Sequence, residues 1–325
     1  MTETTMKAIH VPHTGNAEVL TPVEVPRPTP RPHQVLVKTL ATGVNFIETY
    51  QRAGVYPVEL PFTLGGEACG VVTEIGADVT EFSVGDRITT ASAAATYAEY
   101  FVVDEEFAVT VPEGISDEVA AALPLQGMTA HYLTRSTYQV QPEDTVLFHA
   151  GAGGVGGLAI QLLKSIGATV ITTVSTEEKA EIARSLGADY VLGYDDFAEK
   201  TRDITDGRGV EVVYDSVGKD TFDKSLSTLK TRGTAVLFGG ASGQVPPFDL
   251  QRLNSGGSLF VTRPTLAHYI LNRDELLWRM NELFDLVLAE KLTVRVDQQF
   301  PLAEATQAHQ YLEARKTQGK VILKP

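Results

Sequence analysis

The sequence contains one cysteine, Cys69, and one tryptophan in 325 residues. A single cysteine cannot form an internal disulfide, and it excludes structural zinc sites built on four cysteines. No run rich in Lys or Arg is present and the formal net charge is −14, which disfavours nucleic acid and anionic membrane surfaces as partners. The N-terminal MTETTMKAIH lacks an apolar signal region, and no apolar stretch reaches membrane-spanning length. We therefore expect a soluble, cytoplasmic protein.

Glycine is concentrated in one stretch, DTVLFHAGAGGVGG at 144–157. The apolar run 146–149 is typical of a buried strand, and it ends in Gly151, Gly153 and Gly156 at the spacing G-x-G-x-x-G. A helical pattern of apolar residues follows at once. Such glycines allow a tight turn and a close approach of the backbone to a pyrophosphate at a helix N-terminus. The alternative is a merely flexible glycine-rich loop, against which the flanking strand and helix argue.

The length predicts two domains. The first, residues 1–122, shows short apolar segments broken by Gly and Pro, which is typical of a β-barrel or sandwich. Its expected strands are 7–11, 34–41, 70–75, 86–89, 98–103 and 108–111. Its main expected helix is 45–52, with Asn45 as N-cap and Glu48 as the capping-box partner.

The second domain, residues 123–264, alternates strands and helices, which predicts an α/β fold with a doubly wound parallel sheet. Helices interrupted at Pro124 and Gly127 are expected to lead into it from the segment 117–134. The expected strands are 146–149, 168–174, 190–192, 210–214, 234–238 and 258–262, with helices at 155–166, 177–186, 196–205 and 221–229.

The chain after residue 264 is expected to return to the first domain and complete it, which would leave a cofactor cleft between the two bodies. The pattern predicts a helix at 275–289, a strand at 292–296, a short helix and a strand at 321–323. The expected domains are therefore 1–122 with 265–325, and 123–264.

The segment Thr172–Ser175, at the end of the second strand of this domain, discriminates between the nicotinamide cofactors. NAD-specific sites commonly place Asp or Glu there, where the carboxylate binds the ribose 2′-hydroxyl. Here the segment is uncharged and Lys179 follows one helical turn later, which favours the 2′-phosphate of NADPH. The alternative is that Lys179, which follows Glu177 and Glu178, is only a solvated charge on a helix face.

Several segments spread along the whole chain carry a family resemblance. They are NFIETYQRAGVYP (45–57), HAGAGGVG (149–156), VVYDSVG (212–218), VTRPTL (261–266) and EARKTQGK (313–320). In this order they resemble the bacterial NADPH:quinone oxidoreductases, the zinc-free, zeta-crystallin-like branch of the medium-chain dehydrogenase/reductase superfamily. The resemblance implies a GroES-like β-barrel catalytic domain, a Rossmann domain, a homodimer and reduction of quinones by NADPH.

The sequence departs from the zinc alcohol dehydrogenases of that superfamily at two ligand positions. Asn45 stands where those relatives have a catalytic cysteine, and Gly65-Gly66-Glu67 stands where they have Gly-His-Glu. Glu67 alone cannot supply the three ligands of a catalytic zinc, so we expect no metal site. Cys69 is expected to be a packing residue at the start of a strand.

The resemblance implies that Asn45 and Tyr50 belong to the cofactor and quinone pocket, where each could donate a hydrogen bond to a developing oxyanion. The alternative roles are an N-cap for Asn45 and a half-buried aromatic ring for Tyr50. Further cofactor contacts implied by the resemblance, beside Gly151, Gly153 and Gly156, are Gly154, Val155, Ser175, Lys179, Tyr194, Thr129, Tyr132, Ser216, Phe238, Gly239, Ser242, Arg263 and Arg315. His149 is expected to be a satisfied core histidine, and His131 is assigned no role.

The leading hypothesis is an NADPH-dependent quinone reductase. The nearest alternative is a reductase of activated C=C bonds in enals or enones, since both reactions need only bound NADPH and an electron-poor acceptor. A non-catalytic role, as in relatives that serve as lens crystallins or bind RNA, is disfavoured by the acidic charge, and a zinc alcohol dehydrogenase by the lost ligands. The apolar edge 257–262 predicts a homodimer, because pairing across a two-fold axis would remove an open sheet edge.

Overall fold

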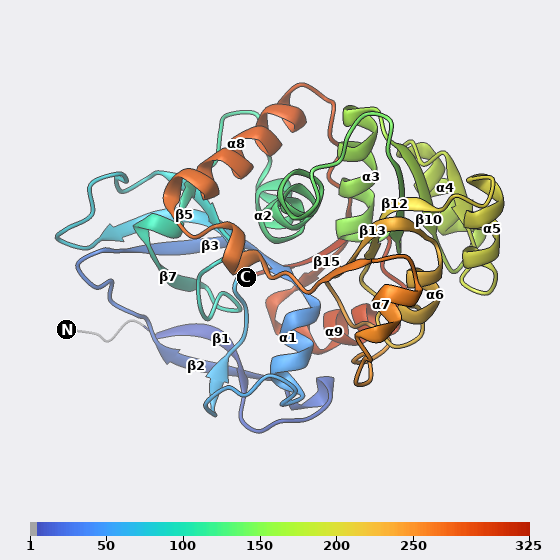
Figure 1. Cartoon of the computed structure of the whole chain (residues 1–325). Coiled ribbons are helices and arrows are strands. Elements are labelled where there is room, and N and C mark those ends of the chain that lie inside the picture. Colours follow the sequence, from blue (N-terminus) through green and yellow to red (C-terminus); the bar gives the residue numbers. More distant parts are fainter. Residues whose placement is uncertain (1–4) are drawn as a thin grey trace. The chain divides into compact units, whose positions relative to one another are not determined.

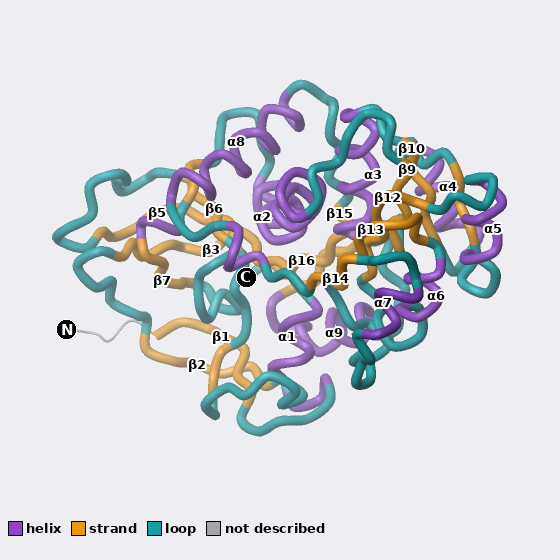
Figure 2. The backbone as a smooth tube through the Cα atoms, in the orientation of Figure 1, coloured by secondary structure: helices purple, strands orange, loops and turns teal. Residues whose placement is uncertain are grey.

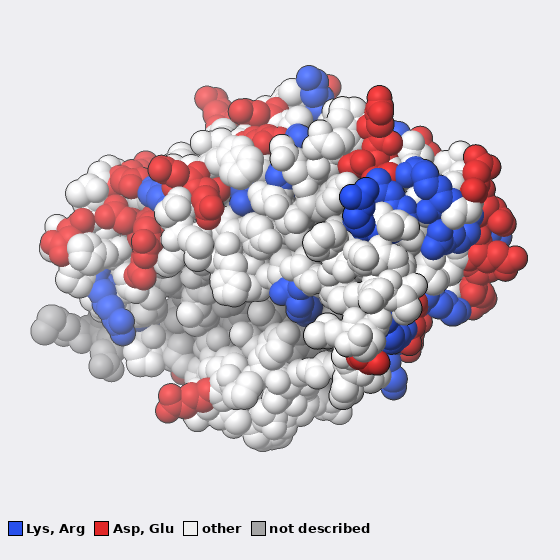
Figure 3. All heavy atoms as spheres, viewed as in Figure 1, with Lys and Arg blue, Asp and Glu red and all other residues white. Residues whose placement is uncertain are grey.

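The computed structural model describes residues 5–325. The chain forms two compact units, one running up to Leu125 and including Asn272–Pro325, the other comprising Gln126–Leu271. Figure 1 shows their elements, and Figure 2 separates helices, strands and loops. No helix within the described part of the chain is both long and apolar enough to span a membrane. On the face drawn in Figure 3, acidic side chains are widespread, and Lys and Arg gather mainly near the strands that Figure 1 labels β10 and β12.

The unit Gln126–Leu271 is built on one parallel sheet of six strands. These are β9 (Thr145–His149), β10 (Thr169–Thr173), β11 (Tyr190–Leu192), β12 (Val210–Asp215), β13 (Leu229–Leu237) and β14 (Phe260–Thr262). Their spatial order is β11-β10-β9-β12-β13-β14 and every pairing is parallel. Numbered within the sheet this is 3-2-1-4-5-6, the order of the dinucleotide-binding fold. The predicted doubly wound sheet is confirmed.

Helices flank this sheet on both sides, as Figures 1 and 2 show. They are α3 (Gly154–Ile166), α4 (Glu177–Ser185), α5 (Phe197–Ile204), α6 (Phe222–Ser227) and α7 (Gln251–Ser255), of which only α7 was not expected. Strand β12 is buried along its full length, in keeping with its place in the middle of a covered parallel sheet. Phe197 and Phe222 pack from α5 and α6 against Leu147, Ile171 and Val213 of the strands.

The other unit contains two sheets. A three-stranded sheet has the order β2-β1-β4, with β1 (Thr5–Val11), β2 (Thr21–Pro26) and β4 (Phe62–Thr63); of these only β1 was expected. The larger sheet has the order β15-β16-β3-β5-β6-β8, and β7 also pairs with β3. Its strands are β3 (Gln34–Val44), β5 (Ala68–Ile75), β6 (Arg87–Thr90), β7 (Tyr100–Asp104), β8 (Val109–Thr110), β15 (Val296–Pro301) and β16 (Lys320–Lys324).

The last strand of the chain lies beside one of the first. Strand β16 pairs antiparallel with β3, so that Val321 is opposite Val44. On its other side β3 pairs with β5, and Thr42 is opposite Ala68. The start of β16 and the start of β5 therefore lie on opposite sides of the last residues of β3, and helix α1 follows directly after β3.

Helix α1 (Phe46–Arg52) begins after Asn45, and the Glu48 carboxylate accepts a hydrogen bond from the Asn45 backbone N–H at 2.7 Å. The predicted N-cap and its Glu48 partner are confirmed. Two further α-helices lie wholly within this unit, α8 (Arg273–Leu288) and α9 (Ala305–Glu313). Leu312 of α9 packs with Leu64 and Leu323 in the core that also holds Tyr97.

Two predicted elements are wrong. The segment 117–134 forms one continuous helix through residue 132, α2 (Asp117–Tyr132), with Pro124 inside it. A proline leaves the carbonyl four residues earlier without its helical donor, and here the Thr89 hydroxyl donates to the Ala120 carbonyl at 2.6 Å.

The strand expected at 292–296 is the second correction. Strand β15 instead occupies Val296–Pro301, where it pairs in parallel with β16. Leu292 is buried, and its N–H donates to the Leu286 carbonyl at the end of α8. Its apolar side chain therefore belongs to the helix terminus rather than to a strand.

Candidate functional site

The glycine turn between β9 and α3 has the close packing that its sequence pattern requires. Gly153 is the N-cap of α3, and the Gly151 N–H donates to the Thr173 carbonyl at 3.1 Å. A Cβ added at Gly151 would overlap the Thr172 side chain, and one at Gly156 would overlap the carbonyl of Ala150. The first N–H groups of α3 have no acceptor within the helix, so this end of the helix suits an anion such as a pyrophosphate.

The end of β10 has the polar character expected from the sequence. Ser175 is exposed just after the strand, and Thr176 caps α4 by accepting a hydrogen bond from the Lys179 N–H at 3.3 Å. Lys179 therefore stands in the first turn of α4. The segment between β10 and α4 carries no acidic side chain, and this favours a 2′-phosphate over a 2′-hydroxyl.

Hydrogen bonds connect the loop after β12 to the loop after β13. The Ser242 hydroxyl donates to the Val217 carbonyl at 2.8 Å and accepts from the Asp220 N–H at 3.0 Å. A Cβ at Gly239 would collide with the backbone of Ser216. Ser216, Gly239 and Ser242 thus lie together at the carboxyl edge of the sheet, the edge where ligands bind in this fold.

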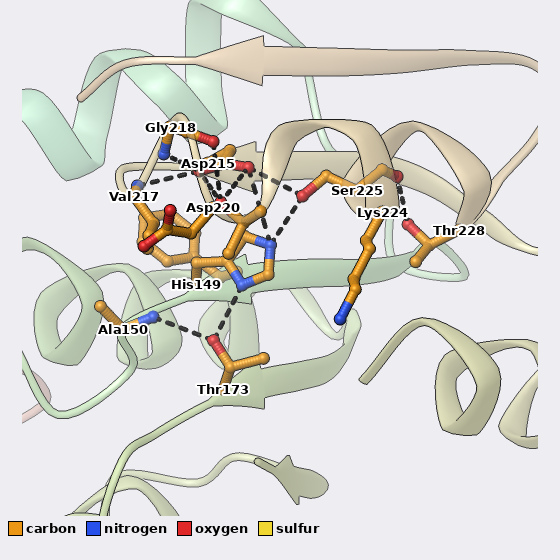
Figure 4. Close-up of polar contacts among 12 residues, drawn as sticks. His149, Ala150, Thr173, Asp215, Val217, Gly218, Asp220, Lys224, Ser225 and Thr228 are labelled. Carbon is orange, nitrogen blue, oxygen red and sulfur yellow. Dashed lines mark hydrogen bonds and ion pairs between the residues drawn. The ribbon is translucent and has the colours of Figure 1, made fainter. Parts of the chain in front are cut away.

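A buried hydrogen-bond network around His149 connects the glycine turn to the loop after β12 (Figure 4). His149 Nδ1 lies 2.8 Å from Thr173 Oγ1, and its Nε2 lies 2.8 Å from Ser225 Oγ. The Ser225 hydroxyl donates to Asp215 Oδ2 at 2.8 Å, and the Ala150 N–H donates to Thr173 Oγ1 at 3.3 Å. Burial lowers the pKa of His149, although the nearby Asp215 carboxylate opposes this shift. The predicted satisfied core histidine is confirmed.

The directions of these hydrogen bonds assign the tautomer of His149. Because the Ser225 hydrogen goes to Asp215, the serine oxygen accepts from His149 Nε2–H, and His149 Nδ1 accepts from the Thr173 hydroxyl. Asp215 Oδ1 also accepts from the backbone N–H groups of Val217 (2.8 Å) and Gly218 (2.9 Å). One network therefore holds both loops.

Three of the predicted cofactor-binding residues, Tyr132, Tyr194 and Phe238, each contact another aromatic ring. Tyr132 is buried and stacks on Tyr269, with ring centroids 4.4 Å apart and planes at 9°. The Tyr194 ring lies 6.0 Å from the His149 ring, and the Phe238 ring lies 5.5 Å from Phe148.

The remaining predicted residue of this unit at a strand end is Arg263, which follows β14. Its side chain is exposed, and Nη1 donates to the Pro264 carbonyl at 3.3 Å. Thr129 lies in α2, one turn before Tyr132.

Asn45 and Tyr50 lie in the other unit, Asn45 as the N-cap of α1 and Tyr50 within that helix. Asn45 is 5 % exposed; its Nδ2 donates to Glu67 Oε2 at 2.9 Å, and its Oδ1 accepts from Lys320 Nζ at 2.6 Å. Lys320 also forms an ion pair with Glu67. The Tyr50 ring makes an edge contact with Tyr56, with centroids 5.7 Å apart.

A second set of buried polar side chains continues from α1 to α9. The Tyr97 hydroxyl donates to Glu48 Oε2 at 2.7 Å, and it lies 3.1 Å from His309 Nε2. His309 Nδ1 accepts from Arg52 Nη1 at 2.8 Å, and Arg52 Nη2 pairs with Glu313 at 2.6 Å. Burial raises the pKa of Glu48 to about 7 and, with help from the Arg52 charge, lowers the pKa of His309 to about 3.

The sequence-predicted residues thus fall into two groups. Within the unit Gln126–Leu271 the structure brings the glycine turn, Ser175, Lys179, Tyr194, Ser216, Phe238, Gly239, Ser242 and Arg263 to the ends of the parallel strands, with Thr129 and Tyr132 on α2. Asn45, Tyr50 and Arg315 belong to the other unit, where Arg315 is exposed just beyond α9. Contacts of these residues with a cofactor stay a prediction.

Sequence reasoning missed Lys320, Tyr97, His309, Thr173, Asp215 and Ser225 as parts of the polar networks. No local pattern marks them, because their partners lie far away in the chain. Cys69 is fully buried, and burial raises the pKa of its thiol to about 12, which confirms its packing role. Among residues 5–325, no three His, Cys, Asp or Glu side chains are placed to hold a metal ion.

Comparison with known proteins places this geometry in a family. Residues 31–113 match the alcohol dehydrogenase GroES-like domain, and residues 154–284 match the zinc-binding dehydrogenase model. Quinone oxidoreductase 1 of Escherichia coli is 44% identical over 96% of this chain and 97% of its own. A 2-haloacrylate reductase of a Burkholderia species is 46% identical over 93% of this chain and 94% of its own.

A solved structure agrees with these relatives. A mycobacterial protein complexed with NADPH superposes with a TM-score of 0.96 at 50% identity, covering 98% of this chain and all of the other. The full-length identity, the paired domain matches and the strand order together show that the chain belongs to the quinone oxidoreductases of the medium-chain dehydrogenase/reductase superfamily.

Proposed function

We propose that this protein reduces quinones with NADPH. The proposal rests on the carboxyl edge of the parallel sheet. There a tight glycine turn leads into α3, and Lys179 follows the end of β10, which carries no acidic side chain. Relatives of nearly full length are named quinone oxidoreductases, and the mycobacterial relative binds NADPH. NADPH, when bound, supplies a hydride from its nicotinamide, and with one proton this hydride converts a quinone to a hydroquinone.

The residues present fit this cofactor. The N-terminus of α3 would hold the pyrophosphate through backbone N–H groups, because Gly151 and Gly156 leave no space for side chains there. Ser175 and Lys179 would hold the 2′-phosphate, and Tyr194 would cover the adenine side. The loops fastened by Ser242 would form the wall beyond β12 and β13.

Asn45 and Tyr50 are the residues proposed to act on the acceptor. A quinone is already electron-poor, so the protein has to hold it in place and offer hydrogen-bond donors to the oxygen on which charge develops. One such donor is typically worth about 3 kcal/mol of transition-state stabilisation. The Asn45 Oδ1 atom is occupied by Lys320, which leaves the amide nitrogen as the group that can donate.

Independence from zinc is also part of the proposal. Asn45 and Gly66 supply neither the thiolate nor the imidazole of a catalytic zinc site. Glu67, the ligand type that is retained, is already paired with the Lys320 ammonium.

The proposal is tested by following NADPH oxidation by the purified protein with 1,4-benzoquinone and 1,4-naphthoquinone. We expect quinone-dependent turnover that prefers NADPH over NADH. A rate equal to that of the enzyme-free reaction with both quinones would refute the activity.

A second candidate function is the reduction of activated C=C bonds. The 46% identity with a 2-haloacrylate reductase favours it specifically. Both acceptors are electron-poor and carry an oxygen that accepts hydrogen bonds. A panel with 2-chloroacrylate, an enal and an enone beside the quinones separates the candidates by kcat/KM.

A homodimer formed through the Rossmann sheets belongs to the same proposal. Strand β14 is the last strand of its sheet, and Phe260 and Val261 on it are 60 % and 39 % exposed. An apolar edge strand of this kind favours pairing with a second copy across a two-fold axis. Location in the cytoplasm stays a prediction.

A further inference from the structure

We propose that Lys320 is a positioning residue that fixes the Asn45 carboxamide as a hydrogen-bond donor toward an oxygen of the acceptor. The inference rests on the proposed function, and it adds the residue that determines which atom of Asn45 the acceptor meets. It also places a side-chain cation beside Asn45, which stands where the zinc relatives have a cysteine ligand.

The Asn45 carboxamide lies between a cation and an anion. Lys320 Nζ has only hydrogens to offer, so the amide atom that faces it at 2.6 Å must be the oxygen. Glu67 Oε2, at 2.9 Å from the other amide atom, can only accept while it is ionised, so that atom must be nitrogen. The two partners select the same orientation, and a flip of the amide would lose both hydrogen bonds.

The ion pair that holds Asn45 is itself fixed. Lys320 and Glu67 are each 1 % exposed. Glu67 Oε1 accepts from the Leu125 N–H at 2.6 Å, while Oε2 receives both Asn45 and Lys320. Such a buried pair keeps its geometry because every charged oxygen has a donor.

The glycine at position 43 leaves the space that this ion pair occupies. Strand β3 separates the start of β16, which carries Lys320, from Glu67 at the entry to β5. A Cβ added at Gly43 of β3 would overlap the Glu67 carboxylate and Cε of Lys320. Glycine at this position therefore lets the lysine and the carboxylate meet across the strand.

The orientation has a chemical consequence. One amide hydrogen of Asn45 goes to Glu67, and the second has no acceptor among residues 5–325. A cation bound to the amide oxygen withdraws electron density from the nitrogen and strengthens that remaining donor. The site therefore selects acceptors that present a carbonyl or carboxylate oxygen, which a quinone and an acrylate share.

Two variants and one control test this role. Lys320→Met alone leaves Glu67 buried without its cation, which is destabilising, so the decisive variant is the double Lys320→Met/Glu67→Gln, which removes both charges and keeps the volumes. Lys324→Met is the matched control, because Lys324 lies on the same strand and pairs with Glu118 at 2.6 Å, with both side chains 34 % exposed.

The first readout does not depend on turnover. The side-chain NH₂ signals of Asn45 are identified in ¹⁵N-labelled protein as the pair missing from Asn45→Ala. We expect this pair to shift in Lys320→Met, which keeps Glu67, as well as in the double variant, and to stay in place in Lys324→Met. The second readout is kinetic: kcat with 1,4-naphthoquinone is expected to fall at least tenfold in the double variant, with the Kd for NADPH within twofold of the wild type.

The outcomes are separable. A folded double variant with unshifted Asn45 signals and unchanged kcat would overturn the role of Lys320. Shifted signals together with an unchanged kcat would also overturn it, because Asn45 would then not act on the acceptor. A wild type that shows no turnover with quinones or acrylates, while its Asn45 signals shift as expected in the variant, would refute the proposed function and leave the orienting contact standing.

Discussion

His309 and Glu48 make opposing contributions to the pH dependence of stability. The folded-state pKa of His309 is about 3 against an ordinary 6.5, because burial and the Arg52 charge disfavour the imidazolium. Between these values the unfolded chain binds a proton that the folded chain does not, so this residue makes the protein more stable as pH rises. Glu48 behaves in the opposite way. Burial raises its pKa from 4.5 to about 7, so between these values the folded chain retains a proton and stability falls as pH rises.

The magnitude follows from linkage. Each pH step of one within these windows changes the free energy of unfolding by about 1.4 kcal/mol per group. The range from pH 5.0 to 6.5 lies between the folded and unfolded pKa values of both residues. Over this range His309 raises and Glu48 lowers the free energy of unfolding by roughly 2 kcal/mol each, so the two contributions cancel in the wild type. The variant His309→Gln removes one of them. The stability difference between wild type and His309→Gln is therefore expected to grow by roughly 2 kcal/mol over this range.

Urea unfolding at pH 5.0, 5.5, 6.0 and 6.5 measures this difference directly. Glu48→Gln serves as the opposing control, because its difference from the wild type is expected to shrink by roughly 2 kcal/mol over the same range. Comparison with the wild type at each pH cancels the titration of the many surface carboxylates. A His309→Gln difference that stays constant with pH would refute the assignment of His309 as a buried neutral base.

Three further perturbations test other parts of the structure. Lys179→Ala is expected to lower the preference for NADPH over NADH roughly tenfold by removing a charged contact with the 2′-phosphate, and an unchanged ratio of kcat/KM values would assign Lys179 to the solvated helix surface. Gly43→Ala should cost about 1–3 kcal/mol of stability in urea, since the new methyl overlaps the Lys320–Glu67 pair, and wild-type stability would contradict that packing. Phe260→Lys should turn a dimer of 35.1 kDa chains into monomers in analytical ultracentrifugation; a wild type that sediments as a single monomer would disprove the dimer itself.

Most of the fold could be predicted because its signals are local. The glycine turn, the C-cap Gly167 at φ 99° and the N-cap Asn45 each depend on a few neighbouring residues. Alternation of apolar runs located all six strands of the parallel sheet. The interpretation of Pro124 as a helix break was wrong because the compensating donor to the Ala120 carbonyl is Thr89, which lies on a strand 31 residues before Ala120.

The site was less predictable for the same reason. Asn45 and Tyr50 were found by resemblance, but the partner that orients Asn45 is 275 residues further along the chain. Lys320 occurs in a short polar segment, QGK, whose composition is that of an exposed turn. Only the antiparallel pairing of β16 with β3 brings its ammonium into the interior.

The network around His149 has a dynamic consequence. Its hydrogen bonds all run in one direction, from the Ala150 N–H through Thr173, His149 and Ser225 to Asp215. No hydroxyl in such a series can reverse alone, because its acceptor would lose a donor while its hydrogen would point at the group that already donates to its oxygen. We therefore expect the glycine turn and the loop after β12 to open as one cooperative unit, so that hydrogen exchange would give their backbone amides a common free energy of opening.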